Sequence, residues 1–113
     1  MIPPLILASS SPRRKALLEQ MGFSFKTFAP EVQEVIFKDE PPKKSVIRLA
    51  HLKAESTALR FRRKKALLIL AADTLVVDPV EGMALGKPKD RKEAQKVLKL
   101  LSGKTHSVWT AYT

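Results

Sequence analysis

Three serines stand between a short apolar run and an amphipathic segment near the start of the chain. Residues 5–8 have the length of a strand, and Ser9, Ser10 and Ser11 follow them directly. Ser11 suits the N-cap of a helix, Pro12 suits the first helical position, and a glycine at 22 suits the position after the last turn. The pattern predicts a strand, a serine-rich turn and a helix over residues 12–21.

Basic side chains gather at the start of this predicted helix. Arg13, Arg14 and Lys15 occupy its first turn, where a cation costs about 0.3–1 kcal/mol because that end of a helix is already positive. Free backbone N–H groups, the serine hydroxyls and the guanidinium groups together form an anion site. A phosphate bound there would reverse the cost. The alternative is that the basic side chains extend into solvent.

A carboxylate interrupts the most apolar part of the chain. Residues 67–72 (LLILAA) are typical of a strand buried on both faces, and Asp73 and Thr74 follow before apolar residues resume. An unpartnered carboxylate is costly to bury. Asp73 therefore either faces a cleft at the carboxyl end of the strand, where a cation or metal offsets the cost, or accepts hydrogen bonds from loop backbone in an Asx-turn. The spacing alone does not separate these two interpretations.

Two lysines have unusual surroundings. Lys53 lies within the apolar stripe of a helix predicted over about residues 45–63. It either extends to solvent at the edge of the core or points into a cleft, and the sequence alone favours the first. Lys87 stands between Gly86 and Pro88, which restrict the backbone around one cation.

The remaining elements alternate between strands, turns and a helix, which predicts an α/β fold in a single domain over residues 1–113. They are a strand over 23–29, a loop over 30–42, a hairpin turn over 78–83, a helix from an Asp90 cap to Gly103, and a strand over 107–113. In the last helix Ala94, Val97, Leu98 and Leu101 form an apolar stripe that we expect to be buried.

Composition narrows the classes of function. The formal net charge is +10, which permits a nucleic-acid, acidic-lipid or polyphosphate partner, but aromatic residues make up only 6% and we do not expect nucleic acid. The absence of cysteine excludes disulfides, a thiolate nucleophile and zinc–thiolate sites. The start of the chain lacks the features of a secretory signal, and no apolar run is long enough to cross a membrane. We therefore expect a cytoplasmic protein with no membrane partner.

Five short motifs occur along the chain in a fixed order. They are S-S-S-P-R-R at 9–14, L-A-H-L-K-A at 49–54, A-D-T at 72–74, G-K-P at 86–88 and L-S-G-K-T-H-S-V at 101–108. Together they resemble the Maf family of nucleotide pyrophosphatases. The resemblance implies a mixed-sheet α/β fold similar to that of the inosine triphosphatases. It also implies hydrolysis of a nucleoside triphosphate to the monophosphate and pyrophosphate with Mg²⁺ or Mn²⁺, and a homodimer.

Carried over residue by residue, the resemblance implies two sets of site residues. The catalytic set is Asp73, Lys53, Lys87 and Glu34. The substrate-binding set is Ser9, Ser11, Arg13, Arg14 and Thr74. Asp73 resembles the proton acceptor for water, and Asp73 and Glu34 resemble the metal ligands. Arg13 and Thr74 match positions tied to base choice.

The triplet A-D-T resembles the branch of the family that acts on dTTP and UTP, whereas the 7-methyl-GTP branch tends to carry S-D-Q. Family members continue beyond the last predicted strand, so we expect the chain to be the N-terminal part of the family domain. The competing hypothesis is a small basic module that binds nucleic acid or polyphosphate without catalysis. That hypothesis explains the charge, but it does not explain Asp73 within an apolar stretch or the ordered motifs.

Overall fold

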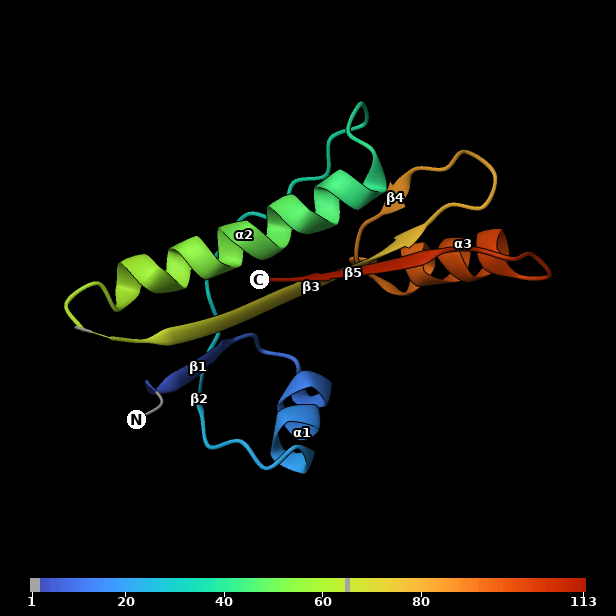
Figure 1. The fold of residues 1–113 in the computed structure, drawn as a ribbon. Helices are drawn as coiled ribbons and strands as arrows, with labels where there is room; N and C mark the ends of the chain where they lie inside the picture. Colours follow the sequence, from blue (N-terminus) through green and yellow to red (C-terminus); the bar gives the residue numbers. More distant parts are fainter. Residues whose placement is uncertain (1–2, 65) are drawn as a thin grey trace.

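The described residues form one mixed sheet and three helices. A computed structural model describes residues 3–64 and 66–113 (Figure 1). In chain order the elements are β1 (Leu5–Ala8), α1 (Pro12–Gln20), β2 (Lys26–Phe28), α2 (Pro42–Arg60), β3 (Leu68–Val77), β4 (Ala84–Leu85), α3 (Arg91–Leu101) and β5 (Val108–Tyr112). The predicted α/β class with a mixed sheet is confirmed. None of the described helices combines the length and apolar character needed to cross a membrane.

The strand β3 organises the sheet because it changes partners halfway along its length. Its first half pairs in parallel with β1, and β1 pairs in parallel with β2. Its second half pairs antiparallel with β5, and its last two residues also pair antiparallel with β4. The predicted strand over 67–72 therefore continues through Asp73 and Thr74, because β5 supplies a partner for residues 72–76.

This change of partner leaves a notch in one edge of β3. Ala71 pairs with β1 and also exchanges two hydrogen bonds of 2.8 Å with Thr113, so β1 and the end of β5 lie on opposite edges. Val76 pairs with both β4 and β5, which places β4 on the same edge as β1. Residues 72–75 lie between β1 and β4 on that edge, and no described strand pairs with them there.

The first turn and helix match their prediction. The Ser11 hydroxyl accepts a hydrogen bond from the Arg14 backbone N–H (3.3 Å), Pro12 begins α1, and Gly22 has a φ of +81° just past its end. The predicted strand over 23–29 is shorter than expected. Only Lys26–Phe28 pair with β1, because the register matches them to the last three residues of that four-residue strand.

Helix α2 begins and ends about three residues earlier than predicted. It starts at Pro42, whose ring favours helical φ in the first turn, and Ser45 lies fully buried inside it. The helix packs against β1, β3 and β5 (Figure 1). Val46 and Leu49 of α2 form the core with Leu75 of β3.

Helix α3 has the predicted cap but not the predicted burial. The Asp90 carboxylate accepts from the Glu93 backbone N–H (2.8 Å), and the Glu93 carboxylate accepts from the Lys89 backbone N–H (2.7 Å). No residue of α3 is buried, and Leu98 is 66% exposed. The expectation of a buried stripe is wrong for this chain, because α2 already covers the sheet and no other described element packs over the stripe.

The position of the core predicts that two leucines of α2 contribute differently to stability. Leu49 is 1% exposed, whereas Leu59 is 66% exposed. We expect Leu49→Ala to lower the free energy of unfolding by about 2–5 kcal/mol, since it leaves a cavity in the core. Leu59→Ala should change it by no more than about 0.5 kcal/mol. Urea unfolding followed by circular dichroism measures both, and equal losses would contradict this assignment of the core.

Candidate active site

A cavity of about 400 Å³ opens at the notch in β3. It lies at the carboxyl ends of the parallel strands β1 and β2, where open α/β sheets place their ligands. Its polar lining residues are Ser9, Ser10, Ser11, Arg14, Glu34, Lys53, Asp73, Thr74 and Lys87. The cavity thus brings together every residue of the two predicted sets except Arg13. Arg13 is exposed and does not line it.

A second cavity, of about 510 Å³, lies at the opposite ends of these strands. Its lining is mainly apolar and includes Pro4, Phe25 and Phe61, together with two lysines and no carboxylate. It lacks a proton acceptor and a metal ligand. The smaller cavity is therefore the better candidate for chemistry.

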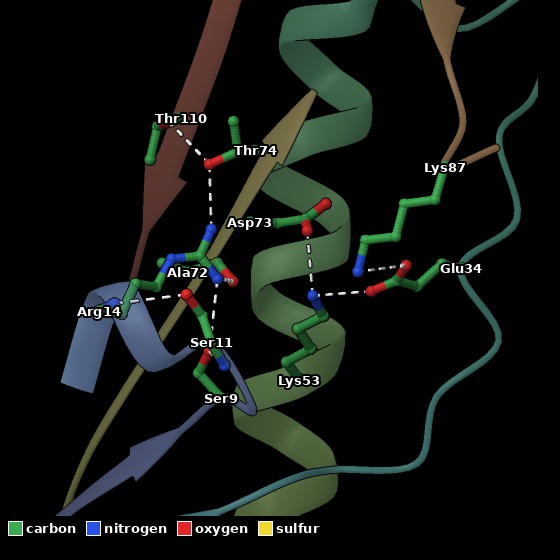
Figure 2. Close-up of polar contacts among 10 residues, drawn as sticks. All are labelled: Ser9, Ser11, Arg14, Glu34, Lys53, Ala72, Asp73, Thr74, Lys87 and Thr110. Atoms are coloured by element: carbon green, nitrogen blue, oxygen red, sulfur yellow. Dashed lines mark hydrogen bonds and ion pairs between the residues drawn. The ribbon is translucent and has the colours of Figure 1, made fainter. Parts of the chain in front are cut away.

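The ammonium group of Lys53 joins the two carboxylates of the site. Its Nζ lies 2.7 Å from Glu34 Oε1 and 2.9 Å from Asp73 Oδ1 (Figure 2). The side chains of Lys53 and Asp73 are 12% and 6% exposed. Lys53 therefore points into the cleft, and the interpretation that it extends to solvent is wrong. The Asx-turn interpretation of Asp73 is also wrong, because this carboxylate bonds to a helix side chain from the middle of a strand.

Contacts within this cluster shift the pKa values of Lys53 and Glu34 toward their charged forms. Burial alone would lower the pKa of Lys53, but hydrogen bonds and charge from Glu34 and Asp73 outweigh it and raise that pKa above its ordinary value. Burial alone would raise the pKa of Glu34. The hydrogen bond and charge of Lys53, with smaller contributions from Lys87 and Arg14, lower it instead. Both shifts favour a charged Lys53 and a charged Glu34 at neutral pH.

Asp73 keeps one oxygen free. Its Oδ2 is buried and has no hydrogen-bond partner among the described residues. A buried carboxylate oxygen without a partner is costly, so this atom is suited to accept a proton or bind a cation. Within residues 3–64 and 66–113 no group of three acidic, histidine or cysteine side chains could hold a metal by itself. The donor set instead fits a cation such as Mg²⁺, which proteins hold through one or two carboxylates plus substrate phosphates.

Arg14 occupies the edge of β3 that the strands leave open. Its guanidinium donates to the Ala72 carbonyl (3.2 Å), to Ser9 Oγ (3.4 Å) and to Thr74 Oγ1 (3.0 Å) (Figure 2). The Thr74 hydroxyl lies 2.9 Å from that of Thr110 on β5. These bonds hold a cation at a defined place on the cavity wall. No pattern in the sequence indicates that Thr110 belongs to the site, since only the register of β5 against β3 brings it beside Thr74.

The serine turn and Lys87 complete the wall. Ser9 Oγ accepts from the Ser11 backbone N–H (3.1 Å), and Ser11 caps α1, so both hydroxyls are fixed by backbone and can still donate their own protons. Lys87 is 83% exposed, and its Nζ lies 3.9 Å from Glu34 Oε2. It is a cation at the rim of the cavity, with room to move toward a ligand.

The buried ion pair predicts the effect of removing its cation. Lys53→Met keeps much of the side-chain volume but leaves Asp73 as a buried charge, so we expect it to lower the free energy of unfolding at pH 7 by about 3 kcal/mol. The double substitution Lys53→Met/Asp73→Asn should recover most of this loss. Lys96→Met, on an exposed part of α3, is the matched control. Chemical unfolding tests this, and a double variant as unstable as the single one would contradict the pairing.

The lowered pKa of Glu34 predicts a dependence of stability on pH. A carboxylate with a folded-state pKa below its ordinary value, about 4.5, stabilises the fold above that value and loses the contribution as the pH falls through the lower pKa. As the pH falls below about 4.5, we therefore expect Glu34→Gln to lose less stability than the parent chain. Acid titrations of urea unfolding measure the two slopes, and circular dichroism at pH 7 checks the fold of the variant. Identical slopes would argue against the Glu34–Lys53 bond.

Several curated proteins are similar in sequence to this chain. A dTTP/UTP pyrophosphatase of Akkermansia muciniphila is 44% identical over 111 residues, which are 98% of this chain and 56% of the relative. The relatives of the same name in Bdellovibrio bacteriovorus and Symbiobacterium thermophilum are 45% and 47% identical, over 98% and 94% of this chain and 58% and 52% of their own length. The chain thus spans about half the length of the curated relatives it matches.

The family assignment rests on almost the whole chain. Residues 4–113 match the sequence model of the family described as Maf-like protein. The match includes all five motifs and every residue that lines the cavity. The chain therefore belongs to the Maf-like protein family.

Proposed function

We propose that residues 1–113 belong to a single domain that hydrolyses dTTP or UTP to the monophosphate and pyrophosphate. The observation that carries the proposal is Lys53 between Glu34 and Asp73, with Oδ2 of Asp73 buried without a described partner, beside a cavity whose other polar lining consists of cations and hydroxyls. The names of the relatives support the substrate class. From the family resemblance we also expect a homodimeric, cytoplasmic enzyme.

The cations and hydroxyls of the wall are suited to a triphosphate. In our proposal Arg14 and the hydroxyls of Ser9 and Ser11 bind phosphate oxygens at the start of α1, where backbone N–H groups and the helix dipole add to the attraction. Lys87 approaches the chain of phosphates from the rim. Arg13 is exposed to solvent, and in our proposal it contacts the substrate when its side chain turns toward the cavity.

The two carboxylates are suited to a divalent cation, Mg²⁺ or Mn²⁺. Asp73 Oδ2 and Glu34 would hold it together with phosphate oxygens of the substrate. Such a cation, when bound, neutralises phosphate charge and makes a coordinated water more acidic. Lys53 bonds to both carboxylates and holds them at a fixed separation, so the two ligands are in place before the substrate arrives.

Asp73 is the proposed proton acceptor. Water attacks the α-phosphorus, its proton passes to the Asp73 carboxylate, and the bond between the α-phosphorus and its bridging oxygen breaks to release pyrophosphate. Positioning and charge neutralisation supply most of the catalysis in such a displacement. Thr74 is held by Arg14 and Thr110 beside the acceptor, so we propose that it contributes to the choice of base.

Turnover of a nucleotide panel tests the proposal. With Mg²⁺ or Mn²⁺ we expect equal amounts of monophosphate and pyrophosphate from dTTP or UTP, and little from CTP, 7-methyl-GTP or dATP. Asp73→Asn removes the proton acceptor and should lower kcat by about 10²-fold or more. Asp39→Asn, at an exposed position outside the cavity, is the matched control.

Two results would contradict the proposed function. One is an Asp73→Asn variant with unchanged turnover. The other is a folded chain that binds no nucleotide but binds DNA in a salt-dependent way that Asp73→Asn leaves unaffected. The second result would support the basic-module hypothesis, which the net charge of +10 favours.

A further inference from the structure

Glu34 lies on a segment without regular secondary structure, between β2 and α2. Within this segment the backbone makes two local hydrogen bonds, from Val35 to Gln33 (3.0 Å) and from Glu40 to Phe37 (3.2 Å). Neither connects it to the sheet, and its backbone joins a helix only at its end, where the Pro41 carbonyl accepts from Lys44 and Ser45 of α2. The position of Glu34 beside Lys53 must therefore depend on side-chain contacts with the rest of the fold.

Arg48 of α2 supplies such contacts. Its Nη2 donates to the carbonyl oxygen of Val35 at 2.7 Å, one residue from Glu34. Its Nε donates to both carboxylate oxygens of Glu40 at 3.1 Å, and its Nη2 lies 2.9 Å from Glu40 Oε1. The guanidinium also lies over the ring of Phe37, 4.6 Å from its centroid. One side chain thus holds three residues of the segment.

Glu40 is itself fixed to the start of α2. The hydroxyl of Ser45, which is fully buried, donates to Glu40 Oε1 at 2.6 Å. Between the two holding points Ile36 packs against the core formed by Val46, Leu49 and Leu75. The segment is therefore anchored at Val35, Ile36 and Glu40, which all follow Glu34 in the chain, and Arg48 is the only described side chain that donates to its backbone.

Helix α2 sets the spacing between the two side chains that hold the Glu34 region. Arg48 and Lys53 are five positions apart on α2, about 7.5 Å along the axis at the rise of an α-helix. Arg48 holds the carbonyl of Val35, and Lys53 holds the carboxylate of the preceding residue. A rigid helix thus fixes both the backbone and the side chain of the Glu34 region.

We propose that Arg48, supported by Glu40, is a positioning residue that places Glu34 at the Lys53–Asp73 pair. The use of Glu34 as a metal ligand rests on the proposed function, whereas its placement by Arg48 does not. Lysine cannot replace Arg48, because an ammonium group lacks the planar fork that reaches a carboxylate and a carbonyl together. Glu40→Gln removes the negative charge that Arg48 binds and so weakens the same set of contacts.

Spin-label distances test the placement directly. The chain has no cysteine, so labels at Gln33→Cys and Glu55→Cys, both exposed, report on the segment relative to α2 alone. We expect a narrow distance distribution in the parent and a broadened one in Arg48→Lys and Glu40→Gln. Arg60→Lys, an exposed position on the same helix, is the matched control. An unbroadened distribution in Arg48→Lys would overturn the proposal.

Mn²⁺ binding, measured by electron paramagnetic resonance without nucleotide, tests whether Arg48 acts through Glu34. Arg48→Lys should weaken the affinity by about tenfold, as is common when a residue that orients a metal ligand is changed. In a Glu34→Gln background the same substitution should have less than about a twofold effect, because its target is gone. A purely structural role predicts equal losses in both backgrounds, and that result would overturn the proposal.

The two measurements separate this proposal from the proposed function. If the parent chain binds no Mn²⁺, the metal part of the proposed function fails. The spin-label distances then still decide whether Arg48 sets the position of Glu34.

Discussion

The ion pair between Lys53 and Asp73 is the interaction on which the site depends. A carboxylate that is 6% exposed, in the middle of a strand, would carry a large desolvation cost without a cation beside it. Lys53 offsets that cost from α2 and also binds Glu34. One ammonium group thus connects the central strand, the covering helix and the irregular segment between β2 and α2. Packing of α2 on the sheet and the chemistry of the cavity are consequently parts of one arrangement.

Because β3 changes partners, part of its edge is open, and the cavity beside this ion pair lies there. Where β1 ends and β4 has not begun, the edge of β3 is open, and Arg14 binds the Ala72 carbonyl that faces it. A phosphate-sized ligand can therefore meet the start of α1, a fixed guanidinium and Asp73 in one place. On one side of this space lie Arg14 and the hydroxyls that line the cavity, and on the other lie the two carboxylates together with Lys53 and Lys87 (Figure 2).

Polar contacts, more than apolar packing, determine the position of the segment that carries Glu34. Its backbone forms no ladder with the sheet, and Ile36 is its one residue packed against the core cluster. Arg48 and Glu40 make hydrogen bonds that depend on direction as well as distance, so they place a side chain more accurately than apolar contacts alone. In contrast, no apolar residue of α3 is fully buried and Leu98 is exposed, which shows that an amphipathic pattern predicts a helix without specifying what covers it.

The sequence predicted most of the local structure and, through the family resemblance, most of the polar residues that line the cavity. Ser11, Pro12 and Gly22 act on backbone close to their own positions, so the first turn and helix are confirmed. Apolar runs predicted the other strands and helices, although β2 is shorter and α2 begins earlier than expected. The motifs also carried the family assignment. Tertiary structure decided which way Lys53 points, that β3 runs through Asp73, and that Thr110 and Arg48 belong to the surroundings of the site. Each of these depends on contacts between residues distant in sequence, which local propensity and periodicity do not encode.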